Sequence, residues 1–265
     1  MRRTPTRPVA VLLAVLLALA PAGCSRADYD TAADLAGMAL DALDAHAGEE
    51  PAAPSAGSSA DGAAPAWDAD SYPDYIAVTG PADFDGVDLP RAGAVAYSRP
   101  DMLGRSGRAV GVITKTLRDE GSARDRHMPD TITGWPSPNP KATVRFADGS
   151  QYRGYLFNKS HLIAKSLGGT DEPDNMVTGT RTQNVGRNDG NGGMAYAETR
   201  ARDWLDAHPD GTVAYMATPV YEGDELLPRY VTVDMRTSDG TLDEHVVVFN
   251  TADGYDIDYL HGGVL

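Results

Sequence analysis

The amino-acid sequence predicts an α+β fold built on an antiparallel sheet. Strand-like runs occur both before and after one prominent helical pattern, and three of them follow that pattern with no helix between them. Parallel strands need a long crossover connection, usually a helix, so consecutive strands without helices favour antiparallel pairing. The chain also lacks the regular alternation of strand and helix that is typical of a parallel sheet.

The first expected pair of strands is a hairpin. Residues 144–146 and 152–157 are rich in aromatic and branched side chains, and they flank Asp148 and Gly149. An Asp-Gly pair favours the tight turn that joins two antiparallel strands. The second run ends four residues before His161.

The main helix is expected from Met194 to Ala207. Its apolar residues recur mostly at spacings of three and four, and Pro209 and Gly211 follow as termination signals. Strands are expected after it over residues 212–217, 230–235 and 245–249. Together these elements predict a sheet with at least one helix packed on it.

The N-terminus has the pattern of an export signal. Three arginines among the first seven residues precede an apolar run over residues 9–20, which is too short to span a bilayer. The only cysteine, Cys24, follows directly after small residues, which resembles a bacterial lipoprotein signal with Cys24 as the lipidated residue. Pro21 departs from the usual leucine of that signal, so conventional cleavage nearby is the alternative.

We therefore expect three regions. Residues 1–24 form the signal, and residues 25–71 form a flexible tether rich in Ala, Pro, Ser and Asp, which cannot bury enough apolar area to order itself. Residues 72–265 form the folded domain. With a single cysteine, the mature chain holds no internal disulfide, so its stability depends on its core.

The net charge of −15 is unfavourable for binding a polyanion, but the charge is unevenly distributed. Residues 25–99 carry 3 basic and 14 acidic side chains, and residues 206–265 carry 2 basic and 12 acidic ones. Residues 100–205 carry 15 basic and 12 acidic side chains. The middle of the chain is therefore the one part that does not repel nucleic acid.

This middle region also holds the most distinctive sequence blocks. Residues 157–164 read Phe-Asn-Lys-Ser-His-Leu-Ile-Ala, residues 167–169 Leu-Gly-Gly, and residues 175–184 Asn-Met-Val-Thr-Gly-Thr-Arg-Thr-Gln-Asn. A histidine can take a proton from water near neutral pH. A neutral amide oxygen can hold a hard cation that keeps most of its waters. This combination suits metal-assisted hydrolysis of a phosphodiester.

These blocks, with the Gly-Gly-Met…Tyr…Glu segment after them, resemble the non-specific DNA/RNA endonucleases of the ββα-metal fold. The likeness is greatest to the secreted DNases of streptococci and runs from about Tyr97 to the C-terminus. It implies a ββα-metal core with a central antiparallel sheet flanked by helices. It also implies hydrolysis of DNA, and of RNA as well, with Mg²⁺ as cofactor and Mn²⁺ as a substitute.

The resemblance also implies roles for single residues. His161 corresponds to the general base that closes the family's Asp-Arg-Gly-His motif. The three residues before it are Asn158, Lys159 and Ser160, so a lysine with a point charge replaces the planar arginine fork. By its position Lys159 is a further candidate catalytic residue, which would neutralise phosphate charge. Asn184 corresponds to the metal ligand, with Asn191 and Asn175 as alternatives.

Glu198, on the expected helix, matches a glutamate that the family places near the hydrated metal; a solvated helix residue is the alternative. Four arginines are expected to bind phosphate, or else to be ordinary surface residues: Arg105, Arg108, Arg181 and Arg187. Trp135 is expected to pack, with base stacking as the lesser option.

The sequence thus predicts a secreted or surface-anchored Mg²⁺-dependent endonuclease, with a membrane contact only through Cys24 and no obligate protein partner. One alternative is a non-catalytic envelope lipoprotein that keeps the nuclease fold as a binding module, which the altered residues 158–160 favour. Another is a nuclease toxin aimed at competitors.

Overall fold

The computed structural model describes residues 64–265. The expected export signal, Cys24 and most of the expected tether lie outside the described residues, and their assignments stay predictions. Within the described part, none of the helices has both the length and the apolar character that a membrane crossing needs.

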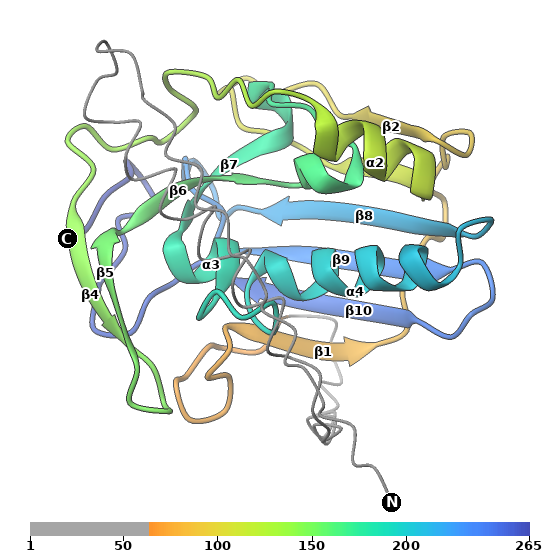
Figure 1. Cartoon of the computed structure of the whole chain (residues 1–265). Coiled ribbons are helices and arrows are strands. Elements are labelled where there is room, and N and C mark those ends of the chain that lie inside the picture. The colour runs from red at the N-terminus through yellow and green to blue at the C-terminus, as the bar shows by residue number, and fades with distance from the viewer. Residues whose placement is uncertain (1–63) are drawn as a thin grey trace, which may run out of the picture. The chain divides into compact units, whose positions relative to one another are not determined.

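The centre of the fold is a six-stranded sheet in which every neighbouring pair is antiparallel. The strands lie in the order β1-β10-β9-β8-β3-β2 (Figure 1). Their bounds are β1 Ile76–Gly80, β2 Ala94–Tyr97, β3 Ala109–Thr114, β8 Thr212–Val220, β9 Tyr230–Thr237 and β10 Asp243–Phe249. The prediction of an antiparallel α+β fold is confirmed.

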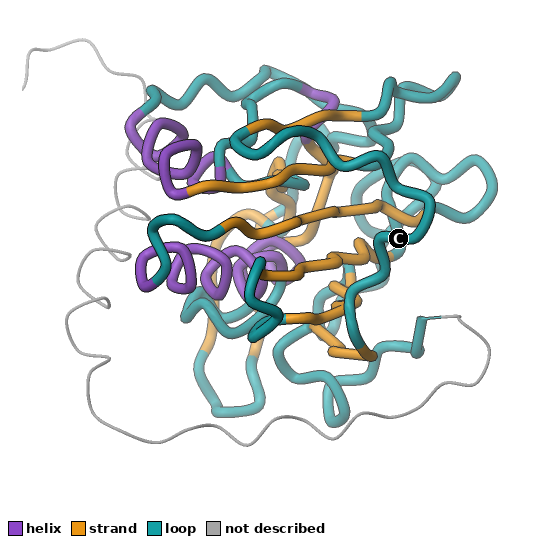
Figure 2. Tube along the Cα trace, turned by 90° about the vertical axis from the view of Figure 1, so that its right-hand side faces the viewer, coloured by secondary structure: helices purple, strands orange, loops and turns teal. Residues whose placement is uncertain are grey.

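Two helices, α2 (Lys115–Ala123) and α4 (Met194–Ala207), pack on this sheet. Figure 2 shows the strands stacked one above another, with the longer helices on the same side of them. The buried face of α4 consists of Met194, Ala197, Ala201, Trp204 and Leu205. It joins the inward-facing valines of β8, β9 and β10 in the largest apolar cluster. The apolar stripe that predicts the helix is therefore the stripe that it buries.

Two smaller antiparallel pairs complete the domain. Strands β4 (Lys141–Arg145) and β5 (Gln151–Tyr155) form one hairpin, and β6 (Phe157–His161) pairs with β7 (Met176–Thr180). Two single-turn helices, η1 (Lys165–Leu167) and η2 (Pro173–Asn175), lie between β6 and β7, and α3 (Arg181–Val185) follows directly. The β6-β7-α3 unit lies beside the N-terminal end of α4 (Figure 1).

The expected elements after the hairpin are confirmed, with small changes. The helix has the expected bounds, while the three strands that follow it each extend beyond the expected runs. The run 152–157 is divided: β5 ends at Tyr155, and Phe157 pairs with Thr180 in β6. Leu156, which lies between them, is fully buried; its N–H donates to the Pro140 carbonyl in the β4–β5 register, while its carbonyl accepts from the Arg181 N–H, directly after β7.

Packed structure begins before Tyr72. The Trp67 ring stacks on that of Tyr75, with centroids 5.2 Å apart, and its indole N–H donates to the Tyr72 carbonyl at 3.0 Å. These contacts lie within the segment expected to be tether, in the part of it that the structure describes.

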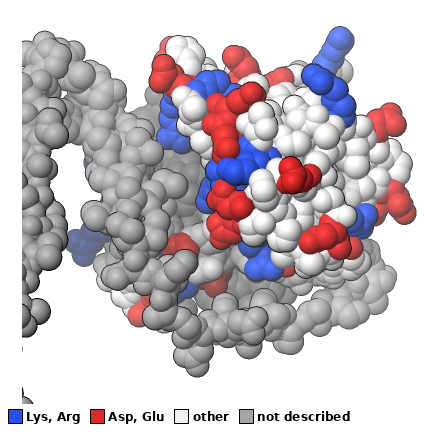
Figure 3. Space-filling model, turned by 45° about the vertical axis from the view of Figure 1, so that its right-hand side comes forward, with Lys and Arg blue, Asp and Glu red and all other residues white. Residues whose placement is uncertain are grey.

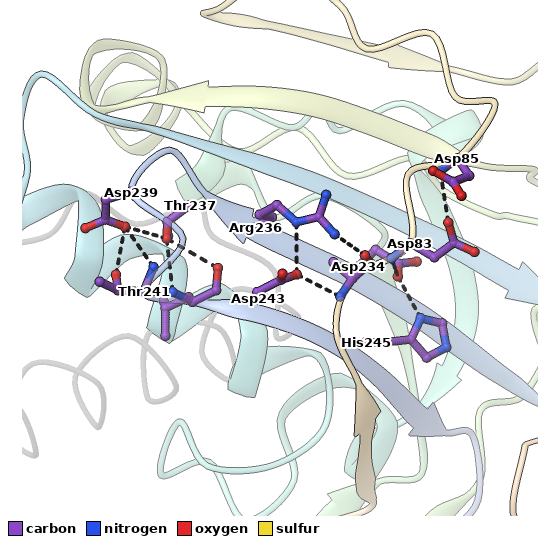
Figure 4. A network of polar contacts seen from close by, with 11 residues as sticks. Asp83, Asp85, Asp234, Arg236, Thr237, Asp239, Thr241, Asp243 and His245 are labelled. Atoms are coloured by element: carbon purple, nitrogen blue, oxygen red, sulfur yellow. Dashed lines mark hydrogen bonds and ion pairs between the residues drawn. The ribbon is translucent and has the colours of Figure 1, made fainter. Parts of the chain in front are cut away.

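The described surface carries charges of both signs. On the face seen in Figure 3, acidic and basic side chains are interleaved, and neither sign forms a large patch. On β9 and β10 such side chains pair into a network with residues 82–85 (Figure 4). Its central contact joins His245 Nδ1 to Asp234 Oδ1 at 2.6 Å.

Candidate active site

His161 is the last residue of β6, where it pairs with Met176, the first residue of β7. The chain between the two strands is folded back on itself by the buried amide of Asn175. This amide accepts from Ile163 N–H at 2.9 Å and donates to the carbonyls of Ile163 and Thr170 at 2.9 and 2.8 Å. The loop is therefore fastened near its end by Asn175, whose fully buried amide has a structural use in this fold.

Two glycines allow that fold. Gly168 has φ +94°, a conformation that L side chains rarely adopt. A Cβ on Gly169 would lie 1.8 Å from the Ile163 carbonyl oxygen, so no side chain fits there. The close return brings Asp171 back toward His161, ten residues earlier in the chain.

His161 and Asp171 form a largely buried pair. The imidazole Nε2 lies 2.8 Å from Asp171 Oδ1, with the two side chains only 10% and 7% exposed. Asp171 Oδ2 accepts the backbone N–H of His127 at 2.7 Å. Burial acts to raise the pKa of Asp171, but the bonds from His127 and His161 and the charge of Arg124 lower it on balance. An ionised carboxylate then assigns the proton to Nε2.

The same environment keeps the imidazole neutral. Burial lowers the pKa of His161; the Asp171 contact opposes this, and the cations of Arg126 and Arg124 reinforce it. With Nε2–H directed at Asp171, the lone pair is on Nδ1, which has no hydrogen-bond partner among residues 64–265. A neutral ring with an unengaged lone pair is the form that a general base requires.

Asn184 lies on α3, directly after β7. Thr180 caps this helix: its side chain accepts from the Gln183 N–H at 3.1 Å, and its own N–H donates to Asn250 Oδ1 at 2.7 Å. The Ser160 hydroxyl donates to Asn184 Oδ1 at 3.1 Å. Since Ser160 precedes His161, one β6 segment carries the histidine and holds the amide.

Glu198 lies on α4, which packs against α3. Burial raises the pKa of its carboxyl to about 7, although Arg202 one turn later opposes the shift. The Arg202 guanidinium is itself bonded to Ser166 and Thr199 rather than to Glu198. Glu198 thus keeps its acceptor oxygens free of hydrogen bonds within the described residues.

The candidate donors are of the kind that a hydrated hard cation takes. Among residues 64–265 no three His, Cys, Asp or Glu side chains converge as a metal cage. A structural zinc site needs several such ligands, whereas Mg²⁺ is held by one or two oxygen donors and keeps its waters. The carboxamide of Asn184 and the carboxylate of Glu198 belong to that second class.

The Lys159 side chain makes structural contacts within the fold. Its ammonium donates to the carbonyls of Pro129 and Asp130 at 2.7 and 2.9 Å and lies 4.7 Å from the centre of the Trp135 ring. Burial lowers the pKa of Lys159. The side chain anchors the preceding loop, and Trp135 packs beneath it.

Three of the four predicted phosphate-binding arginines have partners within the fold. Arg105 pairs with Asp101 and lies over the Tyr221 ring, and Arg181 is buried over Tyr152. The third, Arg187, bridges acidic side chains at Asp74, Asp148 and Asp189.

Two further predicted site residues, Arg108 and Asn191, are at the surface. Arg108 is exposed, with no side-chain partner among the described residues. Asn191 is exposed in the glycine-rich loop before α4. Two residues before Arg108, Ser106 is buried, and its hydroxyl donates to the carbonyls of Pro173 and Met176.

Sequence reasoning missed the residues that surround His161, namely Asp171, Arg124 and Arg126. Nothing local distinguishes Asp171 from its acidic neighbours Glu172 and Asp174. The one available signal is that an Asp follows a Gly-Gly turn shortly after a candidate base. The two arginines lie far from the histidine in sequence, just after α2.

Comparison with known proteins identifies the family of this chain. Residues 131–239 match the family described as DNA/RNA non-specific endonuclease. A deoxyribonuclease from Streptococcus dysgalactiae subsp. equisimilis is 32% identical over 242 residues, which cover 73% of this chain and 73% of that protein.

Solved structures agree as well. The Sda1 nuclease with a bound zinc ion is 37% identical and superposes with a TM-score of 0.72, covering 76% of this chain and 99% of that one. NucA from Streptococcus agalactiae with a bound magnesium ion, at 24% identity and a TM-score of 0.53, covers 66% of this chain and 81% of that one and supports the fold alone.

The fold and site therefore define a nuclease. The chain belongs to the DNA/RNA non-specific endonuclease family, as the sequence blocks predict. It is a metal-dependent endonuclease that acts on DNA.

Proposed function

We propose that this protein is a secreted or surface-anchored, Mg²⁺-dependent endonuclease that hydrolyses DNA and RNA with little sequence preference, using His161 as general base. The observation that carries the proposal is the orientation of the imidazole. Asp171 holds Nε2 and leaves Nδ1 without a partner in the described chain, on the strand that also holds Asn184 through Ser160.

In this mechanism Nδ1 of His161 takes a proton from the water that attacks phosphorus. The imidazolium that forms is stabilised by the ionised carboxylate of Asp171, 2.8 Å from Nε2. Attack in line with the 3′ oxygen releases that oxygen and leaves a 5′-phosphate on the product. Lys159 takes no part, because its ammonium is engaged elsewhere.

Asn184 would hold the metal, and Glu198 would bind the waters of its shell. When bound, the ion supplies positive charge for the phosphoryl oxygens and the departing alkoxide. We favour Mg²⁺, with Mn²⁺ as a substitute, because a carboxamide and a carboxylate are hard ligands. The related nucleases are described with zinc in one case and magnesium in the other.

Cleavage of RNA is proposed because the base and the metal donors act on the phosphodiester, which both nucleic acids share. Export is proposed from the N-terminal signal pattern, and lipidation of Cys24 from the residues before it. Mass spectrometry of the mature N-terminus tests the anchor, since a diacylated cysteine and a free N-terminus differ by the mass of the lipid.

The activity is tested by incubating supercoiled plasmid, single-stranded DNA and RNA with the pure protein in Mg²⁺, Mn²⁺ or EDTA. The wild type should cut all three substrates with either metal and none in EDTA. His161→Ala should lower the rate by about 10²- to 10⁴-fold, the range for loss of a general base.

His261→Ala is the matched control, because this histidine is exposed and its only hydrogen-bond partner among the described residues is Asp258. It should cut at the wild-type rate. Intact plasmid after prolonged incubation of the wild type would instead favour the non-catalytic binding module, and full cleavage by His161→Ala would refute the assigned base.

A further inference from the structure

This inference rests on the proposed function and concerns how the site holds its phosphate. A nuclease site needs a cation for the charge on phosphorus besides the metal, and guanidinium is best suited because its planar fork matches two phosphate oxygens. Lys159 does not supply this cation, because its ammonium binds two backbone carbonyls and lies over the Trp135 ring.

The structure brings another basic segment to the histidine. Residues 124–127 read Arg-Asp-Arg-His and follow directly after α2. This segment is fastened to the loop after β6 at two points. The Arg124 guanidinium donates to the Gly169 carbonyl, and the His127 N–H donates to Asp171 Oδ2 at 2.7 Å.

The second contact sets the distance from the base. Asp171 bridges the two partners, with His127 on one carboxylate oxygen and His161 on the other. Arg126 therefore directly precedes His127, whose backbone N–H binds the same Asp171 carboxylate as the His161 ring. α2 itself approaches closely here, because a Cβ on Gly121 would lie 2.3 Å from the Lys165 carbonyl oxygen.

The Arg126 side chain is not used by the fold. It is exposed and makes no hydrogen bond or ion pair with any described residue. Its charge nevertheless reaches the ring, because it is one of the groups that lower the pKa of His161. A guanidinium that is free, exposed and electrically coupled to the base differs from Arg105, Arg181 and Arg187, which have partners inside the fold.

We propose that Arg126, supported by Arg124, binds the scissile phosphate in this enzyme, in place of the side chain at position 159. The arginine comes from the segment after α2 rather than from β6, and Asp171 couples its position to that of the base. DNA or RNA backbone phosphate is the ligand, and contact with phosphate alone adds no preference for base sequence.

The test compares Arg126→Ala, Arg126→Lys and Arg91→Ala. Arg91 is exposed before β2 with no side-chain partner among the described residues, so its loss removes the same charge elsewhere. Arg126→Ala should lower kcat/KM on plasmid DNA by about 10- to 100-fold, as expected for one charge-assisted hydrogen bond. Arg126→Lys should recover part of this, and Arg91→Ala should stay within about twofold of wild type.

Binding gives a readout that does not depend on catalysis. In EDTA, the affinity for a fluorescent DNA duplex should fall in Arg126→Ala, and the slope of log K against log salt should decrease by about 1. Thermal unfolding should be unchanged, because the side chain is exposed and makes no hydrogen bond or ion pair with residues 64–265.

The outcomes separate the two proposals. If the wild type cuts DNA and Arg126→Ala matches it in kcat/KM and in salt slope, the arginine assignment is wrong and the proposed function stands. If the wild type fails to cut, the proposed function is wrong, and the salt slope still decides whether Arg126 contacts phosphate.

Discussion

Two histidine–aspartate pairs in this protein have nearly the same local geometry and opposite electrostatics. His161 Nε2 lies 2.8 Å from Asp171 Oδ1 in the candidate active site, and His245 Nδ1 lies 2.6 Å from Asp234 Oδ1 in the network on β9 and β10 (Figure 4). The pKa of His161 is lowered, whereas that of His245 is raised.

The surroundings explain the difference. Around His161, burial is the largest effect and disfavours the charged ring, and two nearby arginines add to it. Around His245, the hydrogen bond to Asp234 is the largest effect, and the charge of Asp83 adds to it against a smaller cost of burial. A carboxylate partner therefore does not by itself set the charge of a histidine.

The difference also separates the roles of the pairs. A neutral imidazole with one free nitrogen is suited to accept a proton, whereas an imidazole whose charged form is favoured by a buried carboxylate is suited to join two strands. Substitutions that exchange or weaken parts of each pair test this separation.

Replacing the aspartate of each pair by asparagine should give the largest difference between the two pairs. In Asp171→Asn the side-chain NH₂ can donate to Nε2, which moves the ring proton to Nδ1 and blocks the base. We expect kcat to fall by about 100-fold or more, by the same reasoning as for an orienting aspartate in a hydrolase. Initial rates on plasmid DNA measure this.

The matched change Asp234→Asn should leave kcat within about twofold of wild type. It should lower the free energy of unfolding by about 1–3 kcal/mol, because the bonds to His245 and to the Asp83 N–H are weakened in a buried site. Urea unfolding measures the loss. Asp171→Asn with half the wild-type kcat would show that the carboxylate does not orient the base.

The pH dependence of stability should have opposite signs at the two histidines. His245 has a raised folded-state pKa, so its contribution is fully present below the unfolded value of about 6.5 and is lost as pH rises through the folded pKa. His161 has a lowered folded-state pKa, so its burial costs stability as pH falls below about 6.5.

Urea unfolding at pH 5.5 and pH 8.5 therefore distinguishes them. His245→Ala should be more destabilising at pH 5.5 than at pH 8.5. His161→Ala should be less destabilising at pH 5.5 than at pH 8.5. The same sign for both variants would show that the two environments do not differ as described.

The smallest effect concerns the pH profile of catalysis. The acid limb of kcat/KM should lie below pH 6.5, because Nδ1 of His161 must be unprotonated. Three charged groups act on this ring: Asp171, Arg124 and Arg126. Arg126→Ala removes a cation that disfavours the imidazolium, so the limb should move slightly to higher pH. A shift to lower pH would contradict the placement of that arginine, and His245→Ala should not move the limb.

Much of the fold follows from local pattern. The spacing of apolar residues from Met194 to Ala207 predicts α4, because only a helix places them on one face. Asp148 and Gly149 predict the β4–β5 hairpin through turn chemistry. The division of the run 152–157 was not foreseen, because periodicity does not show where Leu156 exchanges one pairing partner for another.

The candidate site is less evident from the sequence. The ordered blocks identify His161 and Asn184 as candidates through resemblance, and Glu198 with them. The carbonyl partners of Lys159 and the Asp74 and Asp148 partners of Arg187 are not evident, because they lie on segments distant in the chain. For the same reason, the number of basic residues near His161 in the sequence does not show which of them has no hydrogen-bond or ion-pair partner in the described fold.

The sequence by itself determined the α+β class, the main helix, the hairpin and the identity of the base that we propose, because each depends on residues close together or on a motif read in order. Only the tertiary structure decided that Asp171 holds His161 and that Arg126 lies beside the pair. These contacts depend on the turn at Gly168, the amide of Asn175 and the packing of α2 against η1. Such a closure brings together charges that are separate in the chain, and burial then sets how strongly they act on one another.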